Sequence, residues 1–100
     1  MTKVTIKGDH IEIKGHSMFD YHGKDIVCSA ISSIVITTVN GILRIDKDAI
    51  DYKSESGKVI IDIKKHDKVT VALINNMIDL LKELENQYDK NIRVEEVHYD

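Results

Sequence analysis

The sequence has 100 residues, of which 42% are hydrophobic and 31% charged, and its formal net charge is −3. This length fits one domain, and this balance is typical of a folded globular chain rather than a disordered one. A net charge this small argues against a nucleic-acid partner, because nucleic-acid binders present a basic face.

Residues 1–15 predict a β-hairpin. Val4, Ile6, Ile11 and Ile13 alternate with polar residues on either side of a Gly-Asp turn. The alternation leaves no long apolar run, so we expect neither a signal peptide nor a membrane helix here. Together with a single cysteine, this favours a reducing compartment, and we expect a cytoplasmic protein with no membrane partner.

Residues 25–42 predict a helix. Apolar residues recur about every fourth position, and a strand of this length is unusual in a small domain, although many of the residues are β-branched. Asp25 is the predicted N-cap, and Gly41 lies near the predicted end. Residues 17–24 lack periodicity and predict an exposed loop.

The second half of the sequence repeats this pattern. Residues 50–52 and 59–63 flank a turn at residues 54–57, residues 67–89 form an amphipathic helix pattern, and residues 91–95 predict a last strand. The order ββαββαβ predicts a single α/β (α+β) domain over residues 1–100. A small sheet covered on one face by two helices is the simplest two-layer arrangement.

Cys28 is either a packing residue or a nucleophile. A lone cysteine is most often a small buried hydrophobe. If Asp25 caps the helix, however, Cys28 is its third residue. The backbone N–H groups and the positive end of the dipole there favour a thiolate, and the same N–H groups can stabilise an oxyanion.

His16 is the candidate base. It ends the second predicted strand, twelve residues before Cys28. A strand end and a helix start joined by one short loop lie near each other, so a Cys–His pair is sterically feasible. His22, inside the loop, is the alternative base. No third residue that would orient His16 is evident, so a dyad is predicted. The remaining histidines, which we expect to be solvated, are His10, His66 and His98.

No cofactor is expected. His10, His16, His22 and Cys28 are spaced by six residues, which matches no usual zinc pattern, and no second cysteine supports a metal site. The glycines are dispersed and form no phosphate-binding loop.

One motif carries a resemblance to a known family. It consists of Gly15-His16, six further residues and then Gly23-Lys24-Asp25-Ile26-Val27-Cys28, with weaker matches at residues 39–42, at Tyr52 and at residues 88–94. With this spacing the sequence resembles the ribosomal-processing cysteine protease Prp family over nearly its whole length.

The resemblance implies a small homodimeric bacterial enzyme that removes an N-terminal extension from the twenty-seventh protein of the large ribosomal subunit, after two phenylalanines. It places the catalytic residues at His16 and Cys28, and it also matches Asp25, to which we assign capping. We expect residues 17–24 to act as a lid over the peptide. The lid and substrate-contact residues are Phe19, Tyr21, His22 and Gly23.

A non-catalytic module that binds a ribosomal protein and assists assembly is the competing hypothesis, since small size and low charge fit it as well. A second face of the first helix, made of small residues and one isoleucine, is either solvated or a contact between subunits. Its residues are Ser29, Ser32, Ser33, Ile36 and Thr37.

Overall fold

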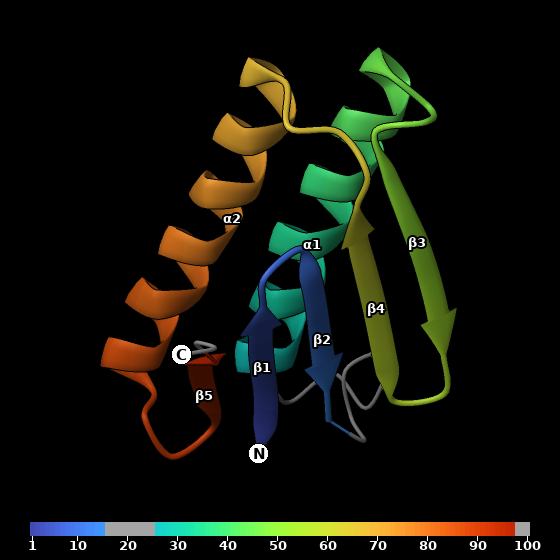
Figure 1. Cartoon of the computed structure of the whole chain (residues 1–100). Helices are drawn as coiled ribbons and strands as arrows, with labels where there is room; N and C mark the ends of the chain where they lie inside the picture. Colours follow the sequence, from blue (N-terminus) through green and yellow to red (C-terminus); the bar gives the residue numbers. More distant parts are fainter. Residues whose placement is uncertain (16–25, 98–100) are drawn as a thin grey trace.

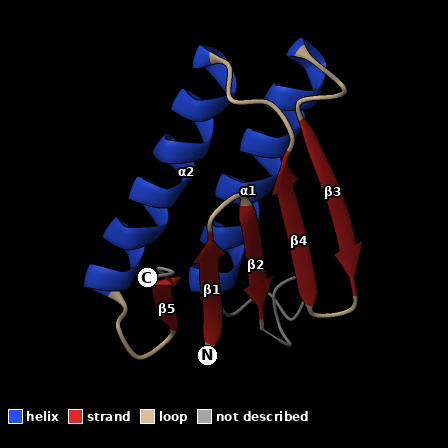
Figure 2. Cartoon of the chain, viewed as in Figure 1, coloured by secondary structure: helices blue, strands red, loops and turns tan. Residues whose placement is uncertain are grey.

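Two β-hairpins supply four of the five strands of the sheet, and each helix follows one hairpin (Figures 1 and 2). The computed structural model describes residues 1–15 and 26–97. The elements in chain order are β1 (Thr2–Lys7), β2 (His10–Lys14), α1 (Ile26–Ile45), β3 (Ile50–Glu55), β4 (Lys58–Ile63), α2 (Lys68–Gln87) and β5 (Ile92–Val97).

The strands lie in the order β3-β4-β2-β1-β5, and both helices cover the same face of the sheet (Figure 1). β5 is parallel to β1, whereas the other neighbouring strands are antiparallel. As a result α1 connects the parallel strands β2 and β3, and α2 connects the parallel strands β4 and β5. The predicted order ββαββαβ and the two-layer fold are confirmed.

The core lies between the sheet and the helices. Val4 faces Ile13, and Ile13 in turn faces Val59, so that one row of aliphatic side chains crosses three strands. All three are fully buried, as are the α1 residues Ile31 and Val35. Alternate strand residues therefore form the apolar floor on which both helices pack.

The opposite face of the sheet is open and polar. Lys3 and Glu95 form an ion pair of 3.3 Å across β1 and β5, and Lys58 and Glu12 form one of 3.2 Å across β4 and β2. These pairs lie on one sheet face, as the alternation in the sequence predicts for strands that are half-buried.

Two histidines expected to be solvated are exposed, with exposed side-chain fractions of 41% for His10 and 60% for His66, and each also has a carboxylate partner. His10 lies directly opposite Asp62, and its Nδ1 is 2.6 Å from the Asp62 Oδ1. His66 Nε2 is 2.7 Å from Asp9 Oδ1. Both contacts join residues more than 50 positions apart in the chain, which is why the sequence did not reveal them.

α1 extends past its predicted end. Gly41 lies inside the helix, has no positive φ and has open space around its Cα, so it does not terminate the helix, which continues to Ile45. By length and composition α1 is apolar enough to cross a membrane. Its inward face, however, packs on the sheet with six buried residues, which is the arrangement of a core helix; these are Val27, Cys28, Ile31, Val35, Val39 and Ile42.

α2 is capped at both ends. Asp67 is the N-cap, and its carboxylate accepts hydrogen bonds from the Thr70 N–H at 3.3 Å and from the Thr70 hydroxyl at 2.7 Å. At the other end the Tyr88 N–H donates to the Leu84 carbonyl at 2.9 Å. Hydrogen bonds to the ionised Asp67 carboxylate hold its pKa below the ordinary value.

Two adjacent leucines of α2 test the packing of the helix on the sheet. Leu81 is fully buried and Leu80 is 37% exposed. We expect Leu81→Ala to lower the free energy of unfolding by about 2–5 kcal/mol, because it removes buried surface and leaves a cavity. Leu80→Ala, the matched control, should change it by less than about 1 kcal/mol. Urea denaturation monitored by circular dichroism measures both, and equal losses would contradict the assigned packing.

The Asp67 cap predicts a pH dependence of stability. A depressed pKa in the folded state stabilises the fold above the unfolded aspartate value of about 3.9 and ceases to do so as pH falls through the folded value. Asp67→Asn keeps a capping side chain but does not titrate. We therefore expect the wild-type melting temperature to exceed that of Asp67→Asn at pH 7, and the gap to shrink as the pH falls below about 4. A gap that does not change with pH would contradict this role.

Candidate active site

Cys28 is the third residue of α1, as predicted. Its neighbour Val27 belongs to the hydrophobic core, and Cys28 itself is 7% exposed. The thiol is therefore largely sheltered, yet it lies at the end of the helix rather than among the fully buried residues in the middle of the core. The thiol is thus sheltered from bulk water and lies close to the N–H groups of the first helical turn.

The helix start gives Cys28 a positive electrostatic environment. The first turn of an α-helix directs its N–H groups along the axis and carries the positive end of the helix dipole. Among the described residues, the first turn of α1 contains no acidic side chain. The N–H groups at this helix start can therefore stabilise an anionic group close to Cys28.

The end of β2 lies at the same end of the sheet as the start of α1 (Figure 1). β2 ends at Lys14, and the N–H of the next residue, Gly15, donates to the Gly57 carbonyl at 2.9 Å. The backbone that leads into His16 is thus fixed by the β3–β4 turn. β2 therefore ends two residues before His16, which was predicted to end the strand, while its end and the start of α1 lie at the same end of the sheet.

The other predicted site residues lie outside the described residues. These are the candidate base His16, the predicted cap Asp25 and the predicted lid and substrate-contact residues Phe19, Tyr21, His22 and Gly23. Cys28 is accordingly the predicted site residue whose position the structure describes, and the contact between His16 and Cys28 stays a prediction.

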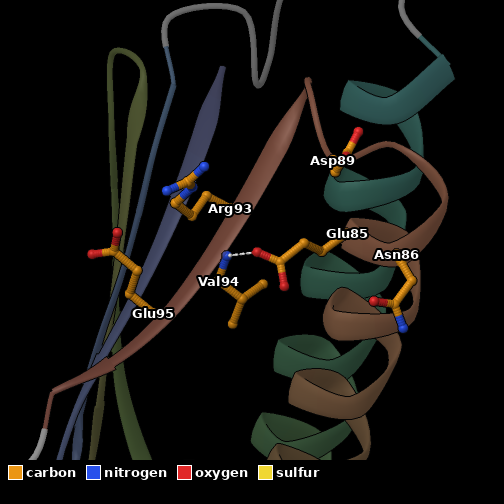
Figure 3. Close-up of a pocket in the computed structure, with 6 residues that line it drawn as sticks. All are labelled: Glu85, Asn86, Asp89, Arg93, Val94 and Glu95. Atoms are coloured by element: carbon orange, nitrogen blue, oxygen red, sulfur yellow. Dashed lines mark hydrogen bonds between the residues drawn. The ribbon is translucent and has the colours of Figure 1, made fainter.

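A polar pocket of about 430 Å³ that the sequence did not suggest lies between the end of α2 and β5 (Figure 3). Its lining residues are Glu85, Asn86, Asp89, Arg93, Val94 and Glu95. The Glu85 carboxylate accepts the Val94 N–H at 2.8 Å and so occupies a backbone donor on the outer side of β5. A carboxylate that protects an edge strand accounts for this feature as part of the fold.

A second pocket of about 290 Å³ lies between α2 and the far ends of β1 and β4, with Ile6, Ile63 and Ile78 among its lining residues. Cys28 lines neither pocket. Within residues 1–15 and 26–97, no three histidine, cysteine or acidic side chains form a group that could hold a metal ion.

Comparison with known proteins agrees with this arrangement. The sequence model of the family described as "Cysteine protease Prp" matches residues 1–93. The ribosomal processing cysteine protease Prp of Mycoplasma genitalium is 32% identical, and the alignment covers 100% of both chains. The protein of the same name from Bacillus subtilis is 28% identical over 94% of this chain and 96% of its own.

Solved structures share the fold. The essential ribosomal processing protease Prp from S. aureus with a covalently linked product peptide superposes with a TM-score of 0.87 at 23% identity, covering 97% of this chain and 100% of that one. The same protease with a substrate peptide gives a TM-score of 0.80 at 20% identity, covering 96% and 97% of the two chains.

The matched family and a cysteine at the start of a helix together define a cysteine protease. More specifically, the chain belongs to the cysteine protease Prp family.

Proposed function

We propose that this protein is an endopeptidase that uses a Cys28–His16 dyad to remove an N-terminal extension from the twenty-seventh protein of the large ribosomal subunit. The observation that carries the proposal is the position of Cys28 in the first turn of α1, at the end of the sheet where β2 leads into His16. A thiol with no chemical role does not need this position at the start of a helix.

The mechanism follows from these two groups. The His16 imidazole accepts the thiol proton, and the Cys28 thiolate attacks the scissile carbonyl carbon to form a tetrahedral oxyanion. N–H groups at the start of α1, including that of Cys28, stabilise the oxyanion. The imidazolium then protonates the leaving amine, the C–N bond breaks, and water hydrolyses the acyl-enzyme to release the acid and the thiol.

The names of the relatives and the peptides bound in the solved structures support a peptide from a ribosomal protein as the substrate. The Mycoplasma genitalium and Bacillus subtilis relatives are named as ribosomal processing proteases, and the S. aureus protease has been solved with substrate and product peptides. We propose an extended peptide that ends in two phenylalanines before the scissile bond. Phe19 and Tyr21 would contact these aromatic side chains, while His22 and Gly23 belong to the same substrate-contact segment and Asp25 caps α1.

The proposed role also bears on the cellular location of the protein and on its need for a cofactor. A substrate that belongs to the large ribosomal subunit places the enzyme in the bacterial cytoplasm, where a thiolate nucleophile also stays reduced. The reaction as written needs no metal or cofactor, since the dyad and the helix start supply the base, the nucleophile and the oxyanion donors.

Single substitutions of the dyad test the proposal. We expect Cys28→Ala to abolish cleavage of a peptide that spans the extension junction, because it removes the nucleophile. His16→Ala should lower kcat by about 10²–10⁴-fold, because it removes the general base. Mass spectrometry of the peptide products measures both.

His10→Ala is the matched control for the histidine substitution. His10 lies at the start of β2 on the open face of the sheet, where it contacts Asp62, so its loss should leave cleavage unchanged. A Cys28→Ala protein that cleaves at the wild-type rate would contradict the nucleophile. An inactive wild type that still binds the ribosomal protein would favour the non-catalytic assembly module instead.

The outer face of α1 supports a homodimer. Ser29, Ser33 and Thr37 are exposed along the helix, Ser32 is half-buried, and Ile36 is 38% exposed between them. Small residues allow two helices to approach closely, and an exposed aliphatic side chain favours burial against a partner. We therefore propose that a second copy of the chain covers this face.

Charge placed on this face tests the dimer. We expect Ile36→Glu to weaken self-association, since a carboxylate buried between subunits is costly. Leu80→Glu is the control, because Leu80 on α2 has nearly the same exposure, 37% against 38%. Sedimentation velocity over a range of concentrations should show a wild-type and Leu80→Glu dimer and a dissociated Ile36→Glu protein. A monomeric wild type would contradict the proposal.

A further inference from the structure

The open face of the sheet carries a line of positive side chains at one end. The strand register places Lys3 directly opposite Arg93 of β5 on one side and directly opposite Lys14 of β2 on the other. Lys14 in turn lies opposite Lys58 of β4. We call these residues, which lie on the adjacent strands β5, β1, β2 and β4, the cationic row.

All side chains of the cationic row point away from the helices. Successive side chains of a strand point to opposite faces, and each member of the row is next to a fully buried residue. These buried neighbours are Val4, Ile13, Val59 and Ile92. In Figure 3 the Arg93 side chain leaves β5 on the side away from α2. The cationic row therefore forms one line on the open face.

The cationic row works against the stability of the sheet. Like charges directly opposite each other on neighbouring strands repel. Neighbouring strands are about 4.8 Å apart, so the row spans about 14 Å. The fold gains nothing from this arrangement of charges, which points to an anion that binds along the line.

Two members of the cationic row have acidic partners. Lys3 Nζ lies 3.3 Å from Glu95 Oε2, and Lys58 Nζ lies 3.2 Å from Glu12 Oε1. The side chains of the first pair are 55% and 41% exposed. Exposed ion pairs contribute little stability, so either lysine can exchange its carboxylate for another anion at little cost.

The other two members, Lys14 and Arg93, are not neutralised in this way. Both are exposed, and neither forms an ion pair with another residue of the ranges 1–15 and 26–97. They are separated by two strand spacings, or about 10 Å, with Lys3 between them. Charges spread along such a line match a linear polyanion better than one small anion.

The residue types of the cationic row favour phosphate groups over an acidic protein surface. Protein–protein interfaces have an apolar centre and are depleted in lysine, and this row contains no aliphatic or aromatic residue. Nucleic acids are bound chiefly through contacts of Lys and Arg with phosphates. Because the row has no aromatic side chain on which a base could stack, such contacts would not depend on base sequence.

We propose that the cationic row binds the phosphate backbone of RNA. The expectation of no nucleic-acid partner came from the net charge of −3, which does not describe where the charges lie. The choice of RNA over DNA rests on the proposed function, since the proposed substrate is a component of the large ribosomal subunit.

The position of the cationic row is compatible with peptide cleavage. It lies at the same end of the sheet as the start of α1 but on the opposite face (Figure 1). RNA bound along the row would therefore leave the helix start uncovered. In this arrangement the RNA holds the enzyme close to its substrate while Cys28 stays open to the peptide.

Fluorescence anisotropy of a labelled oligouridylate of about 12 nucleotides tests the binding. Each phosphate contact with a single strand contributes about 0.7 to the slope of log K against log salt concentration. With contacts from Lys14 and Arg93, the affinity of the wild type should fall about sevenfold between about 50 and 200 mM NaCl.

Substitution of Lys14 should weaken this binding. We expect Lys14→Gln to lower the affinity by about threefold or more and the salt slope by about 0.7, because one phosphate contact is lost. Lys47→Gln is the matched control. Lys47 is exposed between α1 and β3, at the other end of the sheet, so its loss changes the net charge equally and should leave the affinity unchanged (Figure 1).

Substitution of Glu12 should have the opposite effect. Glu12→Gln removes the carboxylate that pairs with Lys58, so it should tighten RNA binding by about threefold and steepen the salt slope. Glu83→Gln, at an exposed position of α2, makes the same change in net charge and should have no effect. Loss of folding cannot tighten binding, so this pair decides the question even if Lys14→Gln is unstable.

Four results would overturn the inference. They are no binding by the wild type at about 50 mM NaCl, equal effects of Lys14→Gln and Lys47→Gln, equal effects of Glu12→Gln and Glu83→Gln, and tighter binding of decaglutamate than of RNA. The last result would identify an acidic protein segment as the partner. An oligothymidylate that binds more tightly than the oligouridylate would overturn the choice of RNA and identify DNA.

RNA binding is measured without cleavage, which separates this inference from the proposed function. Cys28→Ala should bind the oligouridylate as the wild type does. If RNA binding fails while Cys28→Ala abolishes cleavage, only the role of the cationic row is wrong. If Cys28→Ala cleaves normally while RNA binds, only the proposed nucleophile is wrong.

Discussion

The packing of α1 across the sheet is the contact on which the rest of the molecule depends. Its buried stripe, which includes Ile31, Val35 and Val39, lies on the aliphatic side chains of the central strands. Because the same stripe begins with Val27 and Cys28, the core also fixes the height and rotation of the helix start. One set of aliphatic contacts therefore holds the fold together and positions Cys28, the proposed nucleophile, so no separate scaffold is needed to place it.

Much of the fold could be predicted because its signals are local. The alternation in β1 and β2, the turn at Gly8 and the amphipathic pattern of α2 each depend on residues close together in sequence. The end of α1 could not be predicted, because Gly41 costs the helix little when tertiary packing holds the residues on both sides. The contacts of His10 and His66 with aspartates depend on strand order, which a single sequence does not determine.

The sequence predicted the position of Cys28 in the candidate site, but it did not predict contacts that depend on tertiary structure. The place of Cys28 follows from helix periodicity, and the structure agrees. The close approach of Gly15 to Thr2 is invisible in the sequence, since a glycine before a loop ordinarily indicates a turn, and it depends on how the ends of β1 and β2 pack against each other. Similarly, the use of Glu85 to occupy the Val94 N–H depends on how α2 returns beside β5.

The parallel pairing of β1 with β5 joins the first and last strands of the described chain. Contacts of such long sequence separation form late, because loop-closure entropy must be overcome first. During synthesis on the ribosome, the hydrogen bond from the Thr2 N–H to the Asn91 carbonyl and the pairing of Thr2 with Ile92 can therefore form only after residues 91 and 92 have been translated.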